Sequence, residues 1–120
     1  MIITVGLRQD PDWYYLDDFY VIDTVTGATM NHDPSFETGG LTACCGSSST
    51  CDTFRVYPQG RVIYGNAHTG NYCFQDGAVG DPDYFTITIP NIVIGRTYNI
   101  SFWLMNTPGT PNVAMVIVGS

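Results

Sequence analysis

Apolar and polar residues alternate along several short segments of this sequence, and turn-forming residues separate those segments. In residues 98–105, Tyr, Ile, Phe and Leu alternate with Asn, Ser, Trp and Met, and in residues 85–89 Phe and Ile alternate with Thr. Successive side chains of a β-strand point to opposite faces of a sheet, so this alternation predicts half-buried strands. No window shows apolar residues at helical spacing. We therefore expect an all-β, antiparallel sandwich of jelly-roll type, with about eight or nine strands.

Two segments, residues 13–22 and 113–118, are apolar on both predicted faces. A strand with two apolar faces is usually covered on both sides. Residues 24–34 show no apolar period and are expected to form a connector, and residues 35–40 to begin a further strand. The expected organisation is a closing-strand segment over 1–23, the connector, and a jelly-roll body over 35–120.

The charge balance argues against several classes of partner. The chain of 120 residues has four arginines, no lysine and a net charge of −7. Without a basic cluster it has no attraction for phosphate backbones or anionic lipids, so we expect neither nucleic-acid binding nor membrane insertion.

The cysteines predict two disulfides, with unpaired core thiols as the alternative. Cys44, Cys45, Cys51 and Cys73 form an even set without the spacing of a zinc site. Adjacent cysteines rarely bond each other, so Cys44 and Cys45 are each expected to pair with one of the other two, in either combination. Disulfides persist in oxidising compartments, which predicts an extracellular or cell-surface protein. The first residues lack the features of a secretion leader, so either a leader has been removed or the sequence begins inside a longer chain.

Three segments, read in order, resemble jelly-roll modules of the carbohydrate-binding-module and galactose-binding-like superfamily. Residues 31–39 (NHDPSFETG) resemble the opening motif of such modules, residues 66–72 (NAHTGNY) an inner strand entry, and residues 95–104 (GRTYNISFWL) a later strand. Residues 7–19 (LRQDPDWYYLDDF) resemble the closing pair of strands, yet here they come first.

This order fits three arrangements: a circularly permuted domain, one period of a tandem array, or strands 1–23 that complete a neighbouring copy. The two segments that are apolar on both faces favour the second or the third. We therefore expect a non-enzymatic extracellular structural subunit that assembles into a filament or surface array by strand complementation between neighbouring copies or repeats. Its assembly strand would present Ile3, Val5, Leu7, Trp13, Tyr15, Leu16, Phe19 and Val21. The alternative is a monomeric carbohydrate-binding module with a glycan as partner.

The resemblance also implies a structural calcium at Glu37 and Asp17, with plain hydrogen-bonded carboxylates as the alternative. No cofactor is otherwise required. Candidate sugar contacts are the aromatic residues Trp13, Tyr14, Tyr57, Tyr64 and Tyr84, although aromatic residues of strands are more often core residues or cross-strand partners. Asn99 begins the sequon Asn99-Ile100-Ser101 and is a candidate glycosylation site.

Catalysis has little support in the sequence. The histidines, His32 and His68, lie in predicted loops without a Ser, Cys or Asp at a spacing that indicates a triad. We therefore expect a protein that is not an enzyme.

Overall fold

A computed structural model describes residues 1–120 except 10–11, 42–52, 58–59, 78–79, 107–111 and 120; for Gln9 and residues 53–57 it describes the backbone alone. The described part contains eight strands. They are β1 (Ile2–Gln9), β2 (Tyr14–Asp23), β3 (Thr53–Tyr57), β4 (Arg61–Tyr64), β5 (Tyr72–Asp76), β6 (Asp83–Thr88), β7 (Tyr98–Asn106) and β8 (Asn112–Gly119). No helix in the described residues is long and apolar enough to cross a membrane.

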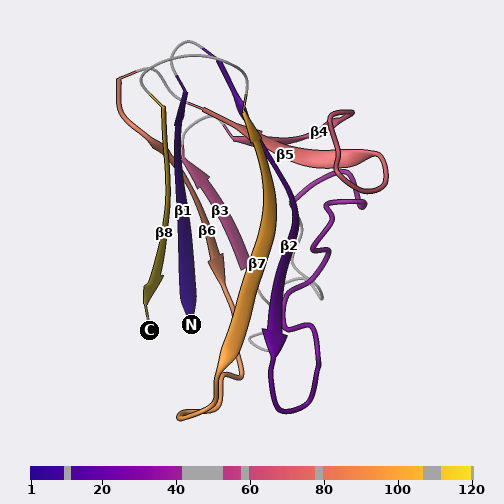
Figure 1. Ribbon diagram of the computed structural model, residues 1–120, viewed down its shortest axis with the longest axis vertical. Helices are drawn as coiled ribbons and strands as arrows, with labels where there is room; N and C mark the ends of the chain where they lie inside the picture. The colour runs from indigo at the N-terminus through magenta and orange to yellow at the C-terminus, as the bar shows by residue number, and fades with distance from the viewer. Residues whose placement is uncertain (10–11, 42–52, 58–59, 78–79, 107–111, 120) are drawn as a thin grey trace.

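The strands form two four-stranded antiparallel sheets that pack face to face (Figure 1). One sheet has the order β3-β6-β1-β8 and the other β4-β5-β2-β7. The first strand pairs with the last, and the pairing continues inward along the chain as in one long hairpin that folds over on itself. β1 pairs with β8, β2 with β7, β3 with β6 and β4 with β5. This pairing confirms the predicted antiparallel sandwich of jelly-roll type.

Residues 1–23 lie inside their own sandwich. β1 is flanked by β6 and β8, and β2 is flanked by β5 and β7. Six of the predicted assembly residues are at most 1% exposed: Ile3, Val5, Leu7, Leu16, Phe19 and Val21. Together with Phe74, Phe85 and Ile87, they form much of the hydrophobic core. Burying each large apolar side chain stabilises the fold by about 1.5–3 kcal/mol. These side chains are therefore core residues of their own chain.

β2 is interrupted by a β-bulge, so its apolar residues at odd and even positions do not mark two apolar faces. Its pairing with β7 shifts register between Asp17 and Tyr20, and Asp18 has a φ of 50°. A bulge of this kind inserts an extra residue and reverses the side-chain parity that follows it. Leu16 before the bulge and Phe19 after it both face the core, where they are 0% and 1% exposed. The bulge thus explains the sequence pattern without a second covering layer.

The prediction of a strand over residues 35–40 is wrong. The segment forms turns, in which Phe36 has a φ of 58° and Gly39 a φ of 81°. Phe36 is nevertheless buried, and its ring lies near those of Phe74 and Phe85, with centroids 6.0 and 6.4 Å away. The turn serves to place one aromatic side chain in the core, which a continuous strand would not do.

Candidate functional site

The bulge in β2 brings two adjacent carboxylates to the loop between β4 and β5. One oxygen of Asp17 accepts the backbone N–H groups of His68 and Thr69, at 2.7 and 3.0 Å, and the other accepts the N–H of Asp18 at 2.7 Å. Burial raises the pKa of Asp17, and these backbone donors offset only part of that effect. Asp17 therefore fixes the middle of the loop against β2.

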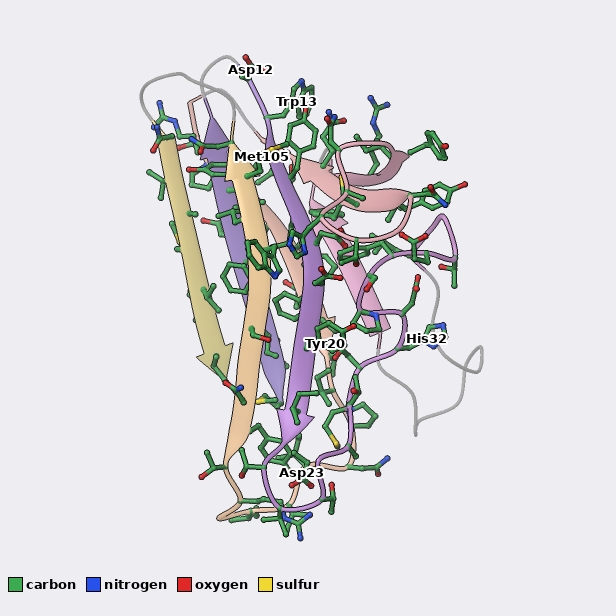
Figure 2. The ribbon with its side chains drawn as sticks, turned by 45° about the vertical axis from the view of Figure 1, so that its right-hand side comes forward. Asp12, Trp13, Tyr20, Asp23, His32 and Met105 are labelled. Atoms are coloured by element: carbon green, nitrogen blue, oxygen red, sulfur yellow. The ribbon has the colours of Figure 1, made fainter. Side chains whose placement is uncertain are left out.

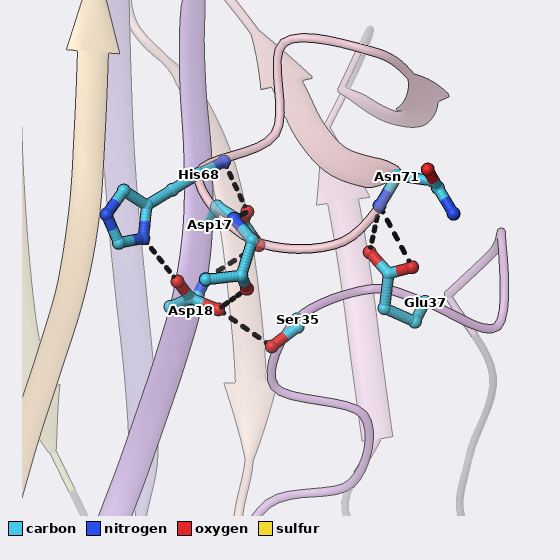
Figure 3. A network of polar contacts seen from close by, with 7 residues as sticks. Asp17, Asp18, Ser35, Glu37, His68 and Asn71 are labelled. Atoms are coloured by element: carbon cyan, nitrogen blue, oxygen red, sulfur yellow. Dashed lines mark hydrogen bonds and ion pairs between the residues drawn. The ribbon is translucent and has the colours of Figure 1, made fainter.

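Asp18 holds three side chains. Its Oδ1 accepts the hydroxyl hydrogens of Ser35 and Thr69, at 2.7 and 2.5 Å, and its Oδ2 lies 2.6 Å from Nδ1 of His68 (Figure 3). Burial opposes ionisation of this carboxyl. The hydrogen bonds from Thr69, His68 and Ser35 outweigh burial and lower the pKa of Asp18. The carboxylate thus orients the imidazole of His68.

Glu37 holds the end of the same loop. Its Oε1 accepts the backbone N–H group of Asn71 at 2.9 Å (Figure 3). The same oxygen accepts the backbone N–H group of Tyr72, also at 2.9 Å. Gly70 has a φ of +64°, and a Cβ there would lie 2.4 Å from the Glu37 carboxylate. Residues 66–71, called the 66–71 loop below, are therefore held by carboxylates at two places, in the middle of the loop at His68 and Thr69 and at its end at Asn71.

The 66–71 loop places His68 over β7. The imidazole lies flat against the indole of Trp103, with ring centroids 3.7 Å apart and planes inclined by 13°. Trp103 lies opposite Asp17 in the β2–β7 pair, on the outer face of the sheet, and is 58% exposed. The pair forms an aromatic surface open to solvent.

A cleft opens beside this pair. Its volume is about 340 Å³, and its lining comprises Tyr15, Asp17, Asn66, Ala67, His68, Trp103, Leu104 and Met105. Figure 2 shows Met105 near the end of β7 that lies by Trp13, with Asp23 at the opposite end of the sheet. We call this the Trp103 cleft. It combines exposed aromatic rings with an amide and an imidazole, and its volume lies in the range of small-molecule sites.

The predicted sugar contacts lie elsewhere. Tyr14 is 5% exposed, and Trp13 is half-buried. Tyr64 on β4 and Tyr84 on β6 are exposed, but neither lines the cleft, and the side chain of Tyr57 is outside the described residues. Of the predicted assembly residues, Tyr15 alone lines it. The alternation along residues 98–105 puts Trp103 on the same face as Asn99, but nothing in the sequence placed His68 beside it.

The two carboxylates predicted to hold calcium do not fit a calcium cage as arranged here. Calcium prefers carboxylates and carbonyl oxygens, whereas backbone N–H groups face both Asp17 and Glu37. The described residues contain no group of three or more His, Cys, Asp or Glu side chains able to hold a metal. The geometry matches the alternative, hydrogen-bonded structural carboxylates.

Cys73 is a buried free thiol, and its Sγ donates to the carbonyl of Gly65 at 3.3 Å. Burial, with a smaller effect from Asp17, raises the pKa of this thiol to about 11. A disulfide at Cys73 is therefore not seen, and Cys44, Cys45 and Cys51 lie outside the described residues. Asn99 is exposed on β7, as its place in the alternation predicts.

No known protein family, no curated protein and no solved structure matches this chain. The resemblance to carbohydrate-binding modules therefore stays a prediction from sequence motifs.

Proposed function

We propose that this chain is a non-enzymatic extracellular binding module that holds a neutral carbohydrate in the Trp103 cleft. The observation that carries the proposal is an exposed indole beside a preorganised loop on a self-contained sandwich. A pyranose has apolar C–H faces that stack on an aromatic ring and hydroxyls that need hydrogen-bonding partners. Trp103 offers the first, and Asn66 and His68 offer the second.

Preorganisation supports this proposal. The 66–71 loop is tied to β2 by Asp17 and Asp18 and to the turn segment by Glu37. A loop fixed before binding loses little conformational freedom when the ligand arrives, which increases affinity. The net charge of −7 favours a neutral ligand over an anionic one.

The hydroxyls near His68 support a role without catalysis. A serine or threonine nucleophile is activated by donating its hydrogen to the imidazole. Ser35 and Thr69 instead donate to the carboxylate of Asp18. The Asp18–His68 pair is best explained as a positioning pair that sets the His68 ring against Trp103.

The test is binding to a panel of neutral oligosaccharides and polysaccharides, measured by isothermal titration calorimetry and affinity electrophoresis. Trp103→Ala is expected to abolish binding to whichever member binds the native protein. The matched control is Tyr64→Ala, which removes a 74% exposed aromatic ring on β4, away from the cleft. Native binding that survives Trp103→Ala, or no binding to any member, would overturn the proposal.

A second candidate is the filament subunit that the sequence suggests, in which residues 1–23 complete a neighbouring copy. An exchanged arrangement would keep the core contacts of β1 and β2 and change only which copy supplies them. Light scattering tests this candidate, because strand exchange from each copy to the next produces particles that keep growing with concentration. A particle that keeps one small size at every concentration would contradict it.

A further inference from the structure

β8 is an edge strand of its sheet, and it is apolar from residue 113 to residue 118. Residues 113–118 are Val, Ala, Met, Val, Ile and Val. Within the described residues β8 pairs with β1 alone, and it lies at the outer side of the sandwich in Figure 1. The exposed fractions of Val116, Ile117 and Val118 are 41%, 54% and 53%.

Both faces of β8 are exposed, including the face turned toward the core. Val116 lies opposite Val5 and Val118 opposite Ile3, so these side chains share the inner face of the sheet. Val5 and Ile3 are 1% and 0% exposed, whereas Val116 and Val118 are about half exposed. In the described part of the chain, β8 packs closely on β1 and on no other strand. β8 therefore projects beyond the edge of the facing sheet.

Edge strands of soluble proteins usually carry devices that prevent pairing, such as lysine, proline or a bulge. Residues 112–119 contain no lysine, no proline and no charge, and their register with β1 is continuous. Along residues 113–118, the side of β8 away from β1 has no neighbouring strand among the described residues, and most of the side chains there are β-branched. Such an edge is a template for another strand.

Charge indicates where two copies of this chain can meet. Two copies of a chain with net charge −7 repel each other, so they approach best where neither carries charge. β8 is uncharged, and a two-fold axis brings the same strand to both sides of the contact. Because β8 would then run antiparallel to its counterpart, the pairing extends the antiparallel pattern of its sheet.

We propose that β8 pairs antiparallel with β8 of a second copy across a two-fold axis. The pairing joins two four-stranded sheets into one continuous sheet of twice that width. It covers β8 and leaves the Trp103 cleft open, because the cleft lies on the outer face of the other sheet. One strand pair buries less than the ~1,600 Å² of a standard interface, so the dimer is reversible and concentration-dependent.

Sedimentation velocity over a concentration series tests the proposal. The native chain is expected to pass from monomer to dimer as its concentration rises. Ile117→Lys, which places a charge on the exposed outer face of β8, is expected to remain monomeric across the series, as is Val113→Lys. Val25→Lys is the matched control: it adds the same charge at a 70% exposed valine in the turn after β2, and it is expected to dimerise like the native chain.

Circular dichroism and thermal melting confirm that each variant is folded before its size is compared. A native chain that stays monomeric to its solubility limit, or an Ile117→Lys variant that dimerises like the native chain, overturns the proposal. Growth beyond a dimer also overturns the two-fold arrangement and points to the open filament. Trp103→Ala is expected to dimerise normally, so failure of sugar binding and failure of dimerisation are distinguishable.

Discussion

The imidazole of His68 stacks on the indole of Trp103 with ring centroids 3.7 Å apart, although His68 lies in a loop and Trp103 in strand β7. The contact exists because Asp18 holds Nδ1 of His68 at 2.6 Å from the β2 bulge. A single left-handed residue in β2 therefore determines where an aromatic surface forms on the neighbouring strand.

Asp18→Asn tests this dependence. Asparagine tolerates the φ of 50° at this position but removes the charge that three side-chain groups contact. We expect a loss of about 1–3 kcal/mol in the free energy of unfolding at pH 7, measured by urea denaturation. Since the pKa of Asp18 is lowered in the folded state, its contribution is present above the ordinary pKa of 3.8 and disappears as the pH falls through the folded value.

The difference between Asp18→Asn and the native protein should therefore shrink at acidic pH. Asp81→Asn, at an exposed aspartate, is the control and is expected to change little at either pH. Equal stability of Asp18→Asn and the native protein at pH 7 would show that the carboxylate does not hold the loop.

Gly70→Ala is expected to destabilise the protein for two separable reasons. Its φ of +64° disfavours any side chain, and the new Cβ would lie 2.4 Å from the Glu37 carboxylate. Gly27→Ala isolates the first reason, because Gly27 has a φ of +74° with nothing within 4 Å. We expect about 1 kcal/mol for Gly27→Ala and a clearly larger loss for Gly70→Ala in chemical denaturation. Equal losses would mean that Glu37 moves aside freely.

Asp76→Asn is expected to stabilise the protein at alkaline pH. Asp76 is fully buried, its Oδ1 accepts the N–H of Gly77, and its Oδ2 has no hydrogen-bond partner among the described atoms. Burial, with the nearby charge of Asp83, raises the pKa of Asp76 to about 7. The folded state thus retains a proton that the unfolded chain releases near pH 3.8, so stability falls as the pH rises from about 4 to 7.

Asparagine keeps the acceptor for Gly77 and removes the charge, so Asp76→Asn should raise the melting temperature by about 5 °C or more at pH 8. The increase should be much smaller at pH 4, where the native side chain is already neutral. Thermal melts at both pH values check this, and an equal change at the two pH values would show that ionisation of Asp76 is not involved.

Chelation tests the predicted calcium at Glu37 and Asp17. Because N–H groups rather than carbonyl oxygens face these carboxylates, we expect EDTA to leave the melting temperature unchanged. A melting temperature that falls with EDTA and returns with added calcium would restore the calcium prediction. Asp17→Asn should then abolish the response.

Cys73 is expected to resist alkylation in the native protein at pH 8, because it is buried and its pKa is raised to about 11. After denaturation without a reductant, iodoacetamide should label Cys73, and peptide mass mapping identifies the labelled residue. A Cys73 that stays unlabelled until a reductant is added would instead support the two predicted disulfides.

The sequence by itself determined the class of fold and much of the core. Alternation along residues 98–105 predicted an inner face of Tyr98, Ile100, Phe102 and Leu104, and these side chains do pack against the core. The same parity put Asn99 and Trp103 together on the other face, which the structure shows to be exposed. Such patterns are readable because side chains alternate strictly between the faces of a regular strand.

Tertiary structure decided what that periodicity does not encode. The β2 bulge changed the parity of Phe19, the turn at Phe36 replaced a predicted strand, and residues 1–23 took the central positions of both sheets. The Trp103 cleft depends on the bulge and on the turn segment, because Asp18 in the bulge and Glu37 in the turn segment hold the 66–71 loop beside β7. A bulge, a left-handed residue and a long-range hydrogen bond each depend on partners that only the folded chain brings together, so local sequence pattern carries little trace of them.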